Sequence, residues 1–124
     1  MRTSRTDDSG SAVVEFAVVV PLLVLITLAV VQVGLALHVR STLQSAAAEG
    51  ARVAAVSGGD RGVARTRAAL ATSIADDVVE KVTATRATVR GVATIVVRIR
   101  ARLPLVGLLG PTDLEVAGHA LVEG

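Results

Sequence analysis

Hydrophobic side chains fill most positions from residue 12 to residue 37 without leaving a polar face. No residue from Phe16 to Leu37 carries a formal charge, and only Thr27, Gln32 and Gly34 interrupt the apolar run. About 20 such residues in a helix cross a hydrocarbon core of roughly 30 Å. The pattern predicts a transmembrane helix over residues 11–38.

The helical pattern continues beyond this segment but becomes one-sided. Apolar and small residues recur there at spacings of four and three, which places them on one face of a helix: Val39, Leu43, Ala46, Gly50 and Ala54. Small side chains permit the close approach of another element. The glycines of Ser57-Gly58-Gly59-Asp60 then favour a helix end. We therefore expect residues 39–57 to continue the first helix and to pack against protein.

A second helix is predicted after these glycines. Asp60 can cap its N-terminus, and the helix is expected to run to about Glu80. Its apolar stripe would consist of Val63, Leu70, Ile74 and Val78.

The pattern then changes to a period of two, which indicates a half-buried strand. One face carries Ala93, Ile95, Val97, Ile99, Ala101 and Leu103, and the other carries Thr94, Val96, Arg98, Arg100 and Arg102. Pro104 ends this strand. Thr83–Val89 is expected as the preceding strand, with Arg90-Gly91 as the turn, and Leu114–Val122 as a third. Strands this close in sequence favour an antiparallel meander.

These elements predict an α+β fold with pilin-like architecture: a long N-terminal helix, a second helix and a small antiparallel sheet. The domain of residues 58–124 is near the size at which a chain without disulfides is marginally stable. We therefore expect residues 39–57 to cover one face of the sheet.

Composition and charge change this picture little. The chain has 13 basic and 11 acidic residues, so its net charge is only +2. The sequence pI of about 10.4 follows from that small excess because the chain has neither tyrosine nor cysteine. The absence of cysteine excludes disulfides and thiolate chemistry.

No catalytic, cofactor or metal site is expected. His38 and His119 lie far apart and lack the spacing of metal ligands. Asp76, Asp77 and Glu80 fit a solvated helix face better than acid–base chemistry, because no other reactive group accompanies them. The sequence predicts a protein that is not an enzyme.

The basic strip of Arg98, Arg100 and Arg102 permits more than one interpretation. A solvated sheet face is favoured, and a contact with another subunit is the alternative. Nucleic acid is disfavoured because base stacking needs aromatic side chains and Phe16 is the only one in the chain. The apolar segment Leu103–Pro111 is expected to tuck under the sheet or to touch the membrane.

The apolar run itself has two unusual members. Glu15 places a carboxylate near its start, where an ionised group usually has a partner. Pro21 removes one intrahelical hydrogen bond and is expected to kink the helix. Ser45-Ala46-Ala47-Ala48 offers a signal-peptidase site, but the run is longer than a signal core, which favours an anchor. The flanking arginines, Arg2 and Arg5 against Arg40 and Arg52, leave the orientation nearly undecided.

Two motifs resemble known sequences. Gly10 followed by Ser11-Ala12-Val13-Val14-Glu15-Phe16 resembles the processing site of type IV pilin-like proteins. Together with the stretch AAAEGARVAA, residues 46–55, it is similar to the TadE-like family of tight-adherence, Flp-type pilus systems. Residues 10–56 carry the resemblance best.

The resemblance implies a pseudopilin or minor pilin that takes part in pilus assembly. Residues 1–10 would be a cytoplasmic leader that a prepilin peptidase cuts between Gly10 and Ser11, and Glu15 with Phe16 would then serve N-terminal amine pairing and assembly. The domain would be extracytoplasmic on a single-pass anchor in the cell membrane. Its partners would be other pilus subunits and assembly proteins. The alternatives are an unprocessed membrane-anchored structural or adaptor protein and a DNA-binding minor pilin.

Overall fold

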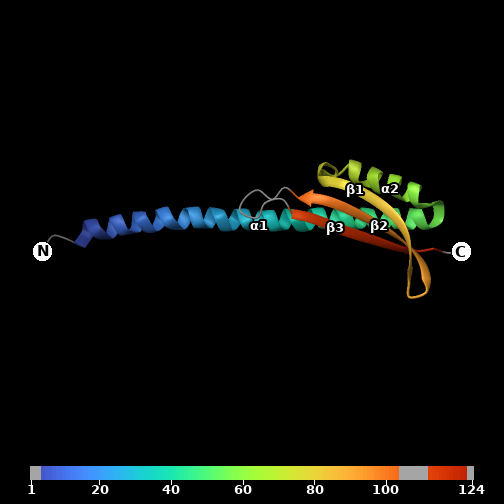
Figure 1. The fold of residues 1–124 in the computed structure, drawn as a ribbon. Helices are drawn as coiled ribbons and strands as arrows, with labels where there is room; N and C mark the ends of the chain where they lie inside the picture. The colour runs from blue at the N-terminus through green and yellow to red at the C-terminus, as the bar shows by residue number, and fades with distance from the viewer. Residues whose placement is uncertain (1–3, 104–111, 123–124) are drawn as a thin grey trace. The chain divides into compact units, whose positions relative to one another are not determined.

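The computed structural model describes residues 4–103 and 112–122, and the chain divides into two compact units, Met1–Leu35 and Ala36–Gly124. Each unit is described by itself. Most of the segment Leu103–Pro111, and Arg2 with the start of the leader, lie outside the described residues. The elements are α1 (Ser4–Ser57), α2 (Gly59–Ala71), the short 3-10 helix η1 (Ile74–Val78), β1 (Val79–Val89), β2 (Val92–Leu103) and β3 (Thr112–Leu121) (Figure 1). The predicted α+β fold is confirmed.

The sheet is an antiparallel meander in the order β1-β2-β3, as the sequence predicts. Arg90-Gly91 forms the turn of the first hairpin, and both residues have positive φ, 52° and 80°. This combination suits a two-residue hairpin turn, since its twist matches that of the strands. In the register, Val97 of the central strand lies opposite Ala84 of β1 and Gly118 of β3.

The core lies between the sheet and the second half of α1. The predicted face of α1 is buried: Val39, Leu43, Ala46, Gly50 and Ala54. From the sheet, the apolar face of β2 is buried against them, with Ile95, Val97, Ile99 and Ala101 at most 1% exposed. Both helices cover this one face of the sheet (Figure 1). The expected packing of residues 39–57 against protein is therefore confirmed.

The prediction for the second helix is wrong at both ends. Asp60 is not the cap, because α2 begins at Gly59 after Gly58, whose φ is 100° and which makes no side-chain cap. The helix ends at Ala71, and Glu80 lies in β1. Ser73 ends it by donating two hydrogen bonds to the Leu70 carbonyl, from its amide and its hydroxyl, both at 2.9 Å. A serine that bonds to nearby backbone competes with helix continuation.

The buried face of α2 also differs from the predicted stripe. Leu70 is buried as expected, but its companions are Gly62 and Thr66. Val63 and Val78 only border the core. The smaller residues lie inside because α2 packs very closely against α1 at this position.

The alternation along β2 holds with three exceptions. Thr94 and Val96, on the face predicted to be solvated, are each 5% exposed. Both lie in the central strand, where side chains from β1 and β3 flank them. Ala93, predicted to face the core, is exposed, because the turn end of the hairpin extends beyond the helices (Figure 1).

Candidate functional site

The processing motif lies in the first unit, on the N-terminal part of α1. Gly10, Ser11, Glu15 and Phe16 are all helical and exposed, and Phe16 is 70% exposed. Ser11 and Glu15 are four residues apart, which is about one helical turn, so they share a face of α1. A side chain at Gly10 would meet no described atom within 4 Å. This backbone is open to a partner, while the roles of the four residues stay predictions.

The apolar segment after the motif is exposed on every side of the helix in this unit. Its most apolar 18-residue window has a mean hydropathy of 2.8, and none of that window is buried. Large side chains on successive positions are all more than half exposed, as with Leu22, Leu23, Val24, Leu25 and Ile26. A helix that is apolar all round requires burial in lipid or among other helices. The segment fits a single-pass membrane anchor.

Pro21 lies inside α1, and the helix continues through it. Six residues after the proline, the Thr27 hydroxyl donates a 2.8 Å hydrogen bond to the Leu23 carbonyl. Leu23 and Thr27 also line a shallow apolar groove along one helix face, together with Val20, Val24, Leu28 and Val31. Proline and threonine bonding of this kind both favour bends in membrane helices. The kink at Pro21 remains a prediction.

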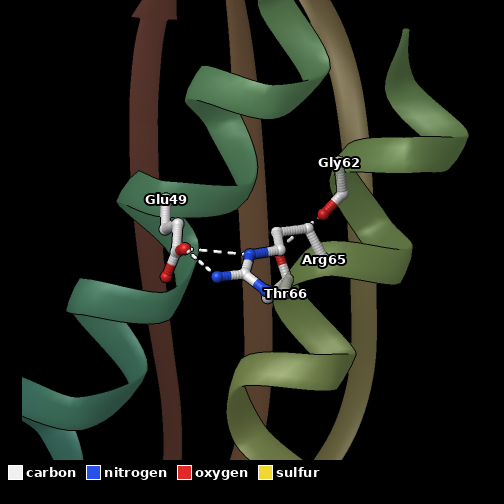
Figure 2. Close-up of polar contacts among 4 residues, drawn as sticks. All are labelled: Glu49, Gly62, Arg65 and Thr66. Carbon is white, nitrogen blue, oxygen red and sulfur yellow. Dashed lines mark hydrogen bonds and ion pairs between the residues drawn. The ribbon is translucent and has the colours of Figure 1, made fainter. Parts of the chain in front are cut away.

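The second motif, residues 46–55, joins α1 to α2 in the second unit. Figure 2 shows Arg65 of α2 reaching Glu49 of α1. The Nε and Nη2 atoms of Arg65 donate hydrogen bonds of 2.8 and 2.5 Å to the same oxygen of Glu49, Oε1. Both side chains are about half exposed, at 52% and 46%. An exposed pair of this kind contributes about 0.2–1 kcal/mol and mainly orients the two helices.

The glycine of this motif sets the distance between α1 and α2. A Cβ atom on Gly50 would lie 1.8 Å from the Thr66 hydroxyl oxygen and 2.9 Å from the Gly62 carbonyl oxygen. A Cβ atom on Gly62 would in turn lie 2.3 Å from the Cβ of Ala54. Thr66 is fully buried, and its hydroxyl donates to the Gly62 carbonyl at 2.9 Å, as Figure 2 shows. At their crossing, α1 and α2 are therefore in close contact through the backbone of Gly50 and Gly62.

A third glycine holds α1 against the sheet. A Cβ atom on Gly118 of β3 would lie 2.3 Å from the Ala47 carbonyl carbon. The sequence pattern identified Gly50. It missed the ion pair between Glu49 and Arg65 and the close contacts at Gly62 and Gly118. Their partners are distant along the chain, so no local pattern indicates them.

The basic strip on the outer face of the sheet is paired with acids. Arg98 and Arg100 form ion pairs with Glu115 at 3.9 and 3.6 Å. Arg102 lies between Glu80 and Asp113, at 3.3 and 3.5 Å. The irregularity in register between Val79 and Lys81 occurs where Glu80 reaches this face. All three arginine side chains remain about 60% exposed. The arrangement is that of a solvated charge ladder.

The other titratable candidates are dispersed. His38 lies on α1 and His119 on β3, both exposed, while Asp76 and Asp77 lie in η1. Within residues 4–103 and 112–122, no group of three histidine or carboxylate side chains could hold a metal ion.

The comparisons with known proteins agree with the first two motifs. Residues 10–52 match the model of a family described as TadE-like protein. No curated protein and no solved structure matches the chain. The match begins at Gly10 and ends just after Glu49-Gly50, so it spans the processing motif, the apolar segment and the start of the helix crossing. The resemblance to the TadE-like family that the sequence indicated is thus confirmed for residues 10–52.

Proposed function

We propose that this protein is a membrane-anchored minor pilin, or pseudopilin, that takes part in assembling a tight-adherence pilus. The observation that carries the proposal is the TadE-like match over residues 10–52, which suggests a minor pilin associated with pilus subunits and membrane. The exposed apolar helix in the same segment supports a single-pass anchor. The domain after residue 38 then provides a folded head for contacts with other subunits.

Processing by a prepilin peptidase is the first step of the proposal. The enzyme would hydrolyse the peptide bond between Gly10 and Ser11, which leaves a carboxylate on Gly10 and a charged amine on Ser11. The glycine suits a protease that must approach the backbone closely. Orientation with the N-terminus in the cytoplasm rests on the family resemblance, since the flanking arginines are balanced.

Glu15 gains a partner through this cleavage. The new amine on Ser11 lies about one helical turn from the Glu15 carboxylate. It can pair with that carboxylate in the same chain or with Glu15 of a neighbouring subunit. Either pair offsets part of the desolvation that makes a lone carboxylate costly in a membrane. Glu15 and Phe16 would therefore act in assembly and not in chemistry.

Intact mass spectrometry of the membrane-extracted chain tests the processing step. Coexpression with a prepilin peptidase should remove residues 1–10, and Gly10→Val should block this removal. Gly34→Val is the matched control, because it is another exposed helical glycine with no described atom near its Cβ position. A wild-type chain that keeps Met1 to Gly10 in the presence of the peptidase would refute processing. It would favour the unprocessed anchor or adaptor protein.

The pairing step has a separate test. Glu15→Gln keeps the size of the side chain and removes its charge, so cleavage should continue while pilus assembly falls. Normal pilus assembly by the cleaved Glu15→Gln chain would refute the pairing role of Glu15. The processing claim would survive that result.

We also infer a structural subunit and neither an enzyme nor a DNA-binding pilin. The arginines that would contact phosphates are already opposed by Glu80, Asp113 and Glu115 on neighbouring strands. These acids lower the positive potential that nonspecific DNA binding requires. DNA affinity that falls with salt and with Arg98→Ala, Arg100→Ala and Arg102→Ala together would contradict this inference.

A further inference from the structure

A surface groove lies beside the outer edge of the sheet in the second unit. It is lined by Arg52, Ala55 and Val56 of α1 and by His119, Ala120 and Leu121 of β3. Val56 is 88% exposed and Leu121 is 64% exposed, which is more than the 46% and 47% of Val89 and Val92 in the first hairpin. The proposed pilin function does not use this groove.

The strand that forms one wall of the groove has an open edge. In the described sheet, β3 is the last strand and pairs only with β2. The Val122 amide, just beyond β3, donates to the Ala93 carbonyl at 2.9 Å. Hydrogen-bonded and non-hydrogen-bonded pairs alternate along an antiparallel ladder. The backbone N–H and C=O groups of Ala117, His119 and Leu121 therefore point away from β2.

This part of the edge lacks the usual protection. Edge strands are commonly blunted by charged side chains, proline or bulges. Asp113 and Glu115 supply charges at the start of β3, but residues 116–121 contain neither carboxylate, lysine nor proline. The contact of Gly118 with Ala47 fixes the strand beside α1. A rigid strand edge and a helix wall thus bound the groove.

We propose that residues 117–121 of β3 bind an extended segment of a partner protein, which adds to the sheet as a fourth strand and places an acidic side chain beside Arg52, on the face of the sheet that α1 covers. Strand addition provides affinity through main-chain hydrogen bonds and specificity through alternate side chains. Among the described residues, no carboxylate forms an ion pair with Arg52, so this guanidinium offers its positive charge to a ligand. Val56, one helical turn from Arg52 on α1, provides the apolar contact for a neighbouring side chain of the same segment.

A second copy of this chain fits the edge less well. Pairing two β3 edges about a twofold axis makes the strands antiparallel. Along α1, Ala47 lies beside Gly118, and residues 52–56 lie beside residues 119–121. The second half of α1 therefore runs parallel to β3. The two residue-38 ends would then lie at opposite ends of the dimer. Anchors that enter one membrane surface do not permit this arrangement.

Synthetic peptides test the proposal on the full chain in detergent micelles. The probe is a capped, fluorescently labelled peptide of sequence TVEVTVT, and its matched control carries lysine in place of glutamate. We expect the acidic peptide to bind at least about tenfold more tightly, as measured by fluorescence anisotropy. N-methylation of alternate peptide amides should abolish binding. The bound peptide should slow hydrogen exchange at the amides of Ala117, His119 and Leu121.

Two matched variants locate the site. Arg52→Glu should reverse the preference between the acidic and the lysine peptide. Arg67→Glu, an exposed change on α2 outside the groove, should leave the preference unchanged. The proposal is overturned by absence of binding, by equal binding of both peptides, or by an unaltered preference in Arg52→Glu. Self-association in sedimentation experiments, with the same amides protected before peptide is added, would assign the edge to a second copy and also overturn it.

Discussion

At the scale of single residues, the glycines of the helix crossing are the most restrictive positions in the domain. A methyl group at Gly50 would overlap the buried Thr66 hydroxyl and approach the Gly62 carbonyl. Gly50→Ala should therefore lower the free energy of unfolding by about 1–3 kcal/mol, the usual cost of overpacking a core. Chemical denaturation in micelles, followed by the circular dichroism of the sheet, measures this change.

Gly34→Ala is the control for that substitution. It also replaces a glycine in α1, but no described atom lies within 4 Å of the new methyl group. It should leave the domain's stability unchanged, since it lies in the first unit. Equal denaturation midpoints for the wild type and Gly50→Ala would contradict the close crossing.

The spacing of residues predicted the face of α1 that carries small side chains, but it did not predict which elements pack against that face. Spacing identified Gly50 because the buried positions of one helix recur at regular intervals. Gly62 and Gly118 gave no such signal. Their side chains are absent because α1 approaches α2 and β3 there, and that approach is set by the tertiary fold.

At the scale of elements, the sheet depends on the second half of α1. Leu43, Ala47 and Ala51 are all fully buried in the core cluster with Ile95 and Val97. A fragment that begins at Gly59 lacks these helix residues and should unfold at lower denaturant than one that begins at Arg40. Removing part of the core should destabilise a domain that is near the size at which a chain without disulfides is only marginally stable. Equal midpoints in guanidinium chloride for the two fragments would refute the dependence.

The strands were more predictable than the helix ends. Alternation of apolar and charged residues identified β2 because one face is buried and the other is solvated. The end of α2 was missed because Val78 and nearby residues continue a helical spacing, while Ser73 ends the helix through its bonds to Leu70. A helix end of this kind depends on the hydrogen bonds of a single side chain, and the spacing of apolar residues does not predict it.

At the scale of the whole molecule, exposed valines in the two units are expected to have different surroundings. Val24 and Val89 are 58% and 46% exposed. Val24 belongs to a helix that is apolar on all sides, whereas Val89 belongs to a hairpin beside charged strands. An arginine near the centre of a membrane helix costs about 2.5–3.5 kcal/mol on insertion scales. The same substitution at a water-exposed position costs little.

Val24→Arg should therefore reduce membrane insertion, while Val89→Arg should not. The measurement is the share of each chain that stays in the membrane pellet after alkaline carbonate extraction. We expect wild type and Val89→Arg to remain in the pellet and a substantial fraction of Val24→Arg to be released. Release of all three chains alike would show that the apolar segment is not an anchor. Retention of Val24→Arg at the wild-type level would contradict the expectation that this position faces lipid. It would mean that another protein group pairs with the introduced arginine.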